Sequence, residues 1–285
     1  MMFPQLSLAG LASSILAIVF SLLNNSASVV NNQSTTVPCA RPCFSGSRVS
    51  SMLAPSPNSG VADFDNDGRL DFAARSGFGG SVWIQRGLGN GLFGDPEIVD
   101  ANVSGFSLLT GDFNNDGATD IFTPGKLYLG NGNGTFSAPI PLILSASANN
   151  YSIGDFNGDD NLDVVGSTFS NSSLQIFYGN GTNGFSGPTT VTFSSAAGVP
   201  ETADLNGDGI SDVAVLLGTG TISVAFGKPD NTFQMPVNYP LGGTTEIGTI
   251  TSGDIDSDGD QDIVGVGVAS NGSQSYPKRA YELMR

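Results

Sequence analysis

Five short stretches of this chain place carboxylate and amide oxygens at one fixed spacing. They read DFDNDGRLD at 63–71, DFNNDGATD at 112–120, DFNGDDNLD at 155–163, DLNGDGISD at 204–212 and DIDSDGDQD at 254–262. Oxygen-bearing side chains stand at positions 1, 3, 5 and 9 of every stretch. A hard cation such as Ca²⁺ takes six to eight oxygen ligands, which a tight loop of this kind can supply. The pattern therefore predicts one calcium site in each stretch.

The predicted ligands are the four side chains of each stretch and the backbone carbonyl at position 7. They are Asp63, Asp65, Asp67, Arg69 and Asp71; Asp112, Asn114, Asp116, Ala118 and Asp120; Asp155, Asn157, Asp159, Asn161 and Asp163; Asp204, Asn206, Asp208, Ile210 and Asp212; and Asp254, Asp256, Asp258, Asp260 and Asp262. Asp, Asn and Gly also favour plain turns, which is the simplest alternative. That alternative does not explain why 19 of the 26 acidic residues lie in these stretches. About five Ca²⁺ ions would bring the formal net charge from −16 to about −6.

Other positions of the stretch predict its backbone. Position 6 is glycine in four copies and Asp160 in the third, so we expect a positive φ there, which aspartate tolerates better than most residues. Position 2 is apolar in every copy, and we expect it to point into the sheet and fix the loop; the residues are Phe64, Phe113, Phe156, Leu205 and Ile255. An EF-hand would need Glu at position 12 and flanking helices. Position 12 carries no carboxylate here, and the aspartate at position 9 would take its place.

The stretches are landmarks of a longer repeat. Their first aspartates are 49, 43, 49 and 50 residues apart, and a glycine-rich turn followed by phenylalanine recurs between them at Phe93, Phe136, Phe185 and Phe233. Between the landmarks lie short β-branched and aromatic runs such as DVAVLL and SLQIFYG, bounded by turn residues. Four short strands in 40–50 residues are typical of a propeller blade. The sequence thus predicts an all-β propeller of four-stranded blades, with Trp83 packed in a blade core.

The ends of the chain bear on the number of blades. Phe44 opens FSGSRV, similar to FSGPTTV at 185–191, and lies 19 residues before Asp63, the same interval as from Phe185 to Asp204. The chain stops 31 residues after Asp254, where the next phenylalanine would be due. Five blades are favoured, with strands at about 47–64 beside strands at about 262–284 in one shared blade. The alternatives are part of a larger ring and pairing of the open edges between chains.

These motifs resemble a known family. DFNNDGATDIFTPG and DLNGDGISDVAVLL are similar to the calcium-binding blades of FG-GAP/VCBS-type repeat proteins, such as those of the integrin α-subunit propeller. The resemblance covers residues 44–285. It implies a β-propeller with one Ca²⁺ per loop and an extracellular adhesive or carbohydrate-associated role, although rings of this family more often have seven blades.

The N-terminal region reads as a targeting segment. An apolar run spans Leu6–Leu23 and small residues follow, which predicts a signal peptide at 1–28. No Lys or Arg precedes Arg41, and an uncleaved membrane anchor is the alternative. Residues 29–43 then form a linker that contains Cys39 and Cys43, for which a local disulfide is the leading interpretation. The propeller occupies 44–285.

Composition limits the functions. The acidic net charge disfavours nucleic acids and anionic membranes as partners. The absence of histidine removes the commonest general base, and the acids outside the loops form no recognisable catalytic pair. We therefore expect a secreted or surface-displayed binding, adhesion or scaffold module, and not an enzyme, with an extracellular protein or a glycan as partner. The turns at 76–80 and 170–173 are candidate contact surfaces. Self-assembly through half-blades is the first alternative, and a polysaccharide-active enzyme is the second.

Overall fold

The computed structural model describes residues 59–76, 80–89, 91–103, 105, 107–142, 144, 148, 150–167, 171–240, 246–268 and 280–281. Within these residues the chain forms strands and turns and no helix. The described part accordingly contains no helix with the length and hydropathy needed to cross a bilayer. The predicted signal peptide at 1–28 and the linker at 29–43, with its two cysteines, lie outside the described residues.

Five antiparallel sheets follow one another along the chain, and we number them sheet 1 to sheet 5. Sheet 1 contains β1 (Ser59–Ala62), β2 (Asp71–Arg75), β3 (Val82–Gln85) and β6 (Glu97–Asp100), with a small ribbon of β4 (Gly87–Gly89) and β5 (Leu92–Phe93). Sheet 2 contains β7 (Leu109–Gly111), β8 (Asp120–Thr123), β9 (Lys126–Tyr128) and β10 (Ile140–Pro141). Sheet 3 contains β11 (Asn150–Gly154), β12 (Asp163–Ser167), β13 (Ser173–Gly179) and β14 (Phe185–Thr192). Sheet 4 contains β15 (Glu201–Ala203), β16 (Asp212–Leu217), β17 (Thr221–Ala225) and β18 (Val237–Pro240). Sheet 5 contains β19 (Glu246–Gly253), β20 (Asp262–Val268) and β21 (Ala280–Tyr281).

Each acidic loop joins the first and second strands of one sheet. The register shows this directly, because the residue before the loop pairs with the aspartate at position 9, as in Gly111↔Asp120 and Gly154↔Asp163. The loops therefore lie within a sheet, between its first two strands, and not in the connections between sheets. The apolar runs on both sides of a loop pair with each other as an antiparallel hairpin, and the loop reverses the chain between them.

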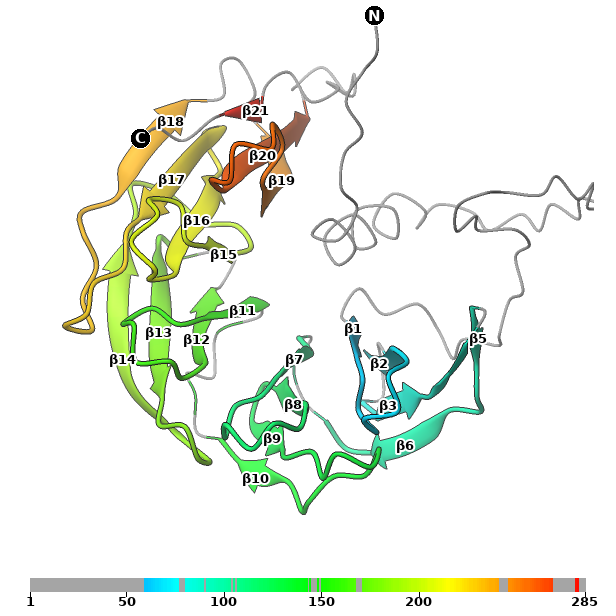
Figure 1. The fold of residues 1–285 in the computed structure, drawn as a ribbon. Helices are drawn as coiled ribbons and strands as arrows, with labels where there is room; N and C mark the ends of the chain where they lie inside the picture. The colour runs from blue at the N-terminus through cyan, green and yellow to red at the C-terminus, as the bar shows by residue number, and fades with distance from the viewer. Residues whose placement is uncertain are drawn as a thin grey trace, which may run out of the picture.

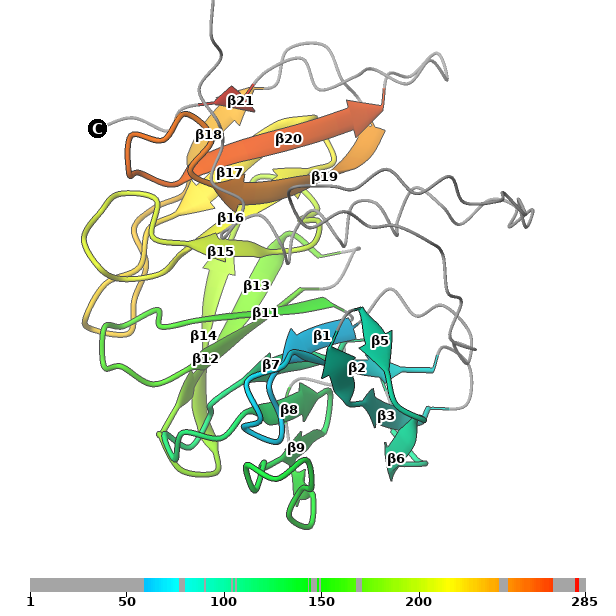
Figure 2. The same ribbon diagram turned by 45° about the vertical axis from the view of Figure 1, so that its right-hand side comes forward.

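The five sheets are arranged around an arc, with sheet 1 and sheet 5 at its two ends (Figure 1). The first strands lie innermost and contact one another in chain order, from β1 to β7, β11, β15 and β19. Adjacent sheets pack face to face through apolar side chains. In the junction of sheets 3 and 4, for example, Val165 and Ile176 meet Val213 and Val215. Figure 2 shows the sheets stacked side by side with the acidic loops projecting from one rim. This is the architecture of a β-propeller, as predicted.

Two further expectations concern the N-terminal strand and Trp83. The segment Ser59–Ala62 pairs with β2 inside sheet 1, so the predicted pairing of 47–64 with 262–284 was wrong for these residues. They supply the innermost strand of their own sheet, because the hairpin register around the first loop holds them there. Residues 47–58 lie outside the described part, and the number of blades stays a prediction. Trp83 is buried in sheet 1 with 3% exposure, as expected.

Candidate metal sites

The aspartate at position 1 organises each loop. In the second loop, Oδ1 of Asp112 accepts a hydrogen bond from the N–H of Asp116 at 3.1 Å, and Oδ2 accepts one from the N–H of Gly117 at 2.8 Å. The bond from position 6 recurs in all five loops, at 2.8–3.2 Å. The carboxylate at position 5 accepts a further bond from the N–H of position 7. The carboxylate at position 1 thus holds the loop backbone in a tight turn around the space into which the side chains at positions 3 and 5 extend.

Two positions of every loop have left-handed backbone. Position 6 has positive φ in all five copies, including +65° at Asp160, which confirms the prediction. Position 4 also has positive φ, and the sequence analysis missed it; the residues are Asn66, Asn115, Gly158, Gly207 and Ser257. Four of these five are Asn or Gly, the residues that adopt this conformation most readily, and this was the available signal.

The aspartate at position 9 is buried and bridges three parts of its sheet. Oδ2 of Asp163 accepts a hydrogen bond from the N–H of Phe156 at 2.9 Å, and Oδ1 accepts one from the N–H of Gly179 at 2.8 Å. The bond to position 2 is present in all five loops, and the bond to the distant glycine in the first four. Position 9 therefore fixes the loop to the sheet as well as facing the other acidic side chains.

The glycine that bonds to position 9 is required by close packing. A methyl group added to Gly130 would lie 2.2 Å from the carbonyl oxygen of Thr119, and one added to Gly179 would lie 2.2 Å from that of Leu162. A methyl group added to Gly87 would lie 2.2 Å from the carbonyl oxygen of Leu70, and one added to Gly227 would lie 2.7 Å from that of Ser211. The glycine that opens each glycine-rich turn is thus explained by the loop beside it.

Burial and crowding raise the pKa of the position 9 carboxyl group in the three middle loops. Burial raises the pKa of Asp120 to about 6, and repulsion from Asp116 and Asp112 adds to this, against the lowering effect of two backbone N–H groups. The same causes raise the pKa of Asp163 and of Asp212 to about 7. A bound cation would remove the repulsion and favour the ionised form.

The residues present fit a hard cation. In the first loop, carboxylate oxygens of Asp63, Asp65 and Asp71 lie within 4.8 Å of one another, and Asp254, Asp256 and Asp262 do the same in the fifth. Oδ1 of Asp65 is buried without a hydrogen-bond partner, which is costly for a carboxylate oxygen unless a cation binds it. In the three middle loops position 3 is asparagine, whose Nδ2 donates to the carboxylate at position 5. The structure thus brings carboxylates of positions 1, 3 and 9 together in the first and fifth loops, and it joins position 3 to position 5 by a hydrogen bond in the three middle loops. Binding of calcium by these residues stays a prediction.

The first loop differs from the others because two guanidinium groups contact it. Arg69 pairs with Asp67 and also donates to the carbonyl of Gly87 at 2.8 Å. Arg86 reaches Oδ2 of Asp65 at 3.3 Å. These arginines neutralise part of the charge at positions 3 and 5, so a metal ion in this loop would compete with them.

The apolar residue at position 2 is buried in four loops, at 0–6% exposure for Phe64, Phe113, Phe156 and Leu205. Ile255 is the exception at 39%, so the prediction that it points into the core was wrong. In the first three loops this side chain packs on the turn phenylalanine of the following sheet, at centroid distances of 5.8–6.1 Å. Ile255 lies in the loop of sheet 5, the last described sheet, and no described residue plays that part for it.

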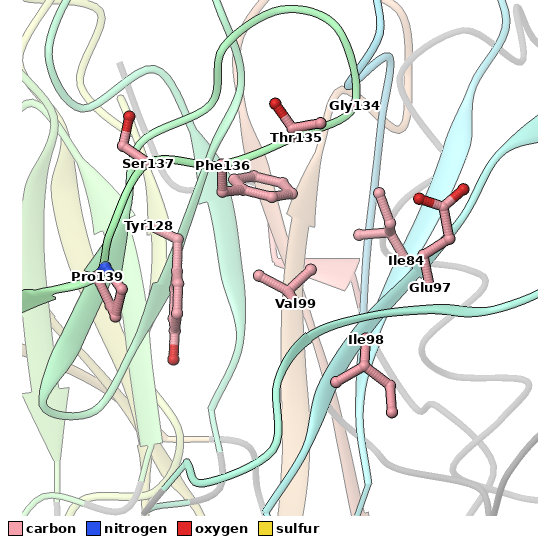
Figure 3. A pocket seen from close by; sticks show the side chains of 10 residues that line it. All are labelled: Ile84, Glu97, Ile98, Val99, Tyr128, Gly134, Thr135, Phe136, Ser137 and Pro139. Atoms are coloured by element: carbon pink, nitrogen blue, oxygen red, sulfur yellow. The ribbon is translucent and has the colours of Figure 1, made fainter.

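The structure also contains a cavity of about 230 Å³ between sheets 1 and 2, drawn in Figure 3. Ile84, Val99 and Phe136 form its apolar wall. Its hydroxyl groups already donate within the fold: Tyr128 to Asp100 at 2.8 Å, Thr135 to Asn133 at 2.6 Å and Ser137 to Asn131 at 3.1 Å. The cavity therefore offers few free polar groups to a ligand. Of the predicted contact turns at 76–80 and 170–173, residues 77–79 and 170 lie outside the described part.

Comparison with known sequences decides the family. The profile of FG-GAP-like repeats matches residues 63–123, 155–215 and 204–265, which together make up more than half of the chain. The protein belongs to the FG-GAP-like repeat family. Each matched segment starts at the first aspartate of one acidic loop and ends just after the next, so the family's unit coincides with the phased loops described above. The comparison with curated proteins found no match.

One solved structure of similar fold supports the propeller fold of this FG-GAP protein. A lectin of Agrocybe aegerita, described as recognising non-reducing terminal N-acetylglucosamine, is 20% identical with a TM-score of 0.56, over 73% of this chain and 60% of the lectin. The FG-GAP chain thus spans about three-fifths of the lectin's length. AofleA of Arthrobotrys oligospora is 16% identical over 71% of this chain and 63% of its own, with a TM-score of 0.42. The Vibrio cholerae biofilm matrix protein Bap1 is 18% identical over 75% and 35%, with a TM-score of 0.41.

Proposed function

We propose that this protein is a secreted or surface-displayed calcium-binding β-propeller that acts as a binding, adhesion or scaffold module. The observation that carries the calcium part is the acidic loop itself. In the first and fifth loops, carboxylate oxygens of positions 1, 3 and 9 lie within 4.8 Å of one another. The position 1 carboxylate holds the loop backbone, and Oδ1 of Asp65 is buried without a hydrogen-bond partner.

In this proposal the side chains at positions 1, 3, 5 and 9 and the carbonyl at position 7 hold the ion. Calcium supplies positive charge to a cluster that otherwise repels itself, and this favours the ionised carboxyl groups. The chain's own residues then fix the loop against its neighbours. Asn115 donates from Nδ2 to Oδ1 of Asn161 in the next loop at 2.8 Å, and Asn157 donates to Oδ1 of Asn231 at 2.8 Å. Ion binding would therefore stabilise the contacts between sheets as well as the loop.

A binding role is supported by how the other acids are used. Asp100 accepts hydrogen bonds from Lys126 at 2.6 Å and Tyr128 at 2.8 Å. Oε1 of Glu201 accepts bonds from the N–H and the hydroxyl group of Ser252, both at 2.8 Å. These two carboxyl groups hold strands together, and a glycosidase would need a pair placed on either side of a substrate. We therefore propose that the protein is not an enzyme.

Glycans and extracellular proteins are the partners we propose. The Agrocybe aegerita lectin has the same type of fold, which makes terminal sugars the first ligands to screen. The test is a glycan array together with a panel of matrix proteins, probed with the full chain in Ca²⁺ and in chelator. Saturable binding to one class of ligand that weakens in chelator supports the proposal. Retention on no ligand, or turnover of a polysaccharide, contradicts it.

A further inference from the structure

The first and fifth loops carry the same four aspartates in surroundings of different charge. The aspartates are Asp63, Asp65, Asp67 and Asp71 in the first loop, and Asp254, Asp256, Asp258 and Asp262 in the fifth. The guanidinium groups of Arg69 and Arg86 contact the first set. Position 7 of the fifth loop is Asp260, and none of the ion pairs among the described residues involves that loop. Two loops with one ligand set thus differ in how much of their negative charge is already neutralised.

Arg86 is shared between two carboxylates and makes a short hydrogen bond to neither. Its Nη1 lies 3.3 Å from Oδ2 of Asp65, and its Nε lies 3.3 Å from Oε1 of Glu97 on β6. Hydrogen bonds between charged groups of this kind are usually about 2.7–2.9 Å long. Nε is also buried, and its ion pair with Glu97 does not have the geometry of a hydrogen bond. A buried donor without an acceptor is costly, so a guanidinium group that turned fully to one carboxylate would be better satisfied.

Asp65 is divided in a similar way. Its Oδ2 accepts the long bond from Arg86, and its Oδ1 is buried without a hydrogen-bond partner among the described residues. A carboxylate oxygen of Asp65 also lies within 4.8 Å of oxygens of Asp63 and Asp71. Asp65 therefore belongs both to the candidate calcium site and to the pair with Arg86, and a cation in the loop would repel the guanidinium group.

The second partner of Arg86 belongs to the cavity between sheets 1 and 2. Glu97 is the one acidic residue among those that line this cavity, and it lies on the sheet 1 side, across from the turn that carries Gly134 (Figure 3). Arg86 lies against that turn as well, because a methyl group added to Gly134 would be 2.7 Å from its Nη2. The N–H of Gly134 donates to the carbonyl of Phe64 in the first loop at 2.8 Å. Arg86 thus contacts the first loop, the cavity wall and the glycine-rich turn of sheet 2.

We propose that the first loop is a calcium-dependent switch in which Arg86 leaves Asp65 and pairs fully with Glu97 when the loop fills. The inference rests on the calcium binding proposed above. Glu97 lies outside the loop and attracts the guanidinium group that the ion repels, so the transfer lowers the negative charge of the cavity wall. The affinity of a calcium loop depends on the charge of its ligands. Because the arginines neutralise part of that charge, the first loop fills at a higher Ca²⁺ concentration than the fifth.

Nuclear magnetic resonance of the full chain labelled with ¹⁵N-glycine measures each loop separately. The N–H groups of Gly68 and Gly259 donate to the position 1 carboxylates of the first and fifth loops, so their resonances report the filling of those loops during a Ca²⁺ titration. Arg86→Gln removes the charge and keeps a polar side chain. We expect it to lower the Gly68 midpoint by roughly fivefold or more and to leave the Gly259 midpoint unchanged. Lys126→Gln is the control, because its ion pair with Asp100 lies outside every loop, and it should change neither midpoint.

Glu97→Gln tests the transfer itself. This variant removes the carboxylate that receives Arg86, so the Gly68 midpoint should rise to a higher Ca²⁺ concentration. Asp95→Asn is the matched control, because it removes the same charge from an exposed residue that makes none of the ion pairs in the described part. In the unaltered chain the Gly134 resonance should shift with the same midpoint as that of Gly68, and this shift should be lost in Arg86→Gln.

Three results would overturn the switch while calcium binding at the other loops stands. They are a Gly68 midpoint that Arg86→Gln leaves unchanged, equal Gly68 midpoints in Glu97→Gln and Asp95→Asn, and a Gly134 resonance that does not respond to Ca²⁺. If no glycine of any loop responds to Ca²⁺ in the unaltered chain, the calcium part of the proposed function fails and the switch fails with it.

Discussion

Replacing Asp163 with asparagine separates the two roles of the position 9 carboxylate. Its oxygens accept hydrogen bonds from the N–H groups of Phe156 and Gly179 at 2.9 and 2.8 Å in a site with 0% exposure. Asparagine keeps one acceptor oxygen, so one buried N–H loses its partner, which costs about 1–3 kcal/mol. In chelator at pH 8 the ionised Asp163 also bears the burial cost and the repulsion that raise its pKa, and asparagine removes both. We therefore expect the free energy of unfolding of Asp163→Asn in chelator to fall by less than the hydrogen-bond cost alone.

Calcium should enlarge the loss. An ion that binds only the folded state stabilises it by about 2.7 kcal/mol when its concentration is 100 times the Kd. If Asp163 is a ligand, the variant forfeits much of that stabilisation at its own loop, and the total loss in Ca²⁺ should exceed the loss in chelator by up to about this amount.

The assay is urea unfolding followed by the fluorescence of Trp83, the single tryptophan, in buffers with Ca²⁺ and with chelator. Asp95→Asn is the control, because Asp95 is exposed and lies outside every loop, and its effect should stay within about 0.5 kcal/mol. Equal losses for Asp163→Asn in the two buffers would show that Asp163 is not a calcium ligand. A loss in chelator above about 3 kcal/mol would contradict the expected offset between the lost hydrogen bond and the removed charge.

Further predictions address pH, backbone strain and the contact between sheets. Because the pKa of Asp163 is raised, the folded protein without metal holds a proton that the unfolded chain releases. The free energy of unfolding in chelator should therefore fall as pH rises from 5 to 8. This fall should be reduced or reversed in Ca²⁺. Circular dichroism melts at four pH values check this, and a stability in chelator that rises over the range contradicts it. Gly117 has a φ of +84° and open space for a methyl group, so Gly117→Ala should lower the free energy of unfolding by about 1–2 kcal/mol through backbone strain alone. Gly218→Ala is the control, because Gly218 has open space and no positive φ, and it should cost little. Equal costs in urea unfolding would contradict this prediction. Glu201→Ala removes the acceptor of the Ser252 N–H between sheets 4 and 5 and should cost about 1–3 kcal/mol, with faster amide exchange at Ser252; unchanged exchange there would argue against the role.

The repeat itself could be read from the sequence because it depends on local chemistry. Short β-branched and aromatic runs, turn glycines and the spacing of the loops predicted strands, loops and the positive φ at position 6, and the structure confirms these. Burial of Trp83 followed from its place in an apolar run. The calcium assignment stays a prediction, because it concerns an ion and not the chain alone.

The predictions that were wrong depend on which strands and sheets pack against one another, and the sequence alone does not give this arrangement. A repeat has the same period wherever its unit is taken to begin, so the spacing could not show that Ser59–Ala62 belongs with the strand after the first loop. Ile255 carries the same apolar signal as Phe156, yet its exposure is set by whether another sheet covers it. The bridging hydrogen bonds of the position 9 aspartate were hidden for a similar reason, because one partner is a glycine 10 to 16 residues away.

Isothermal titration of the chelator-treated full chain with Ca²⁺ tests the central claim most directly. The account predicts saturable uptake of about five ions per chain, together with a rise in melting temperature that Asp116→Ala reduces and Asp95→Asn does not. A folded protein that takes up no calcium, and melts at the same temperature with and without it, would contradict the account.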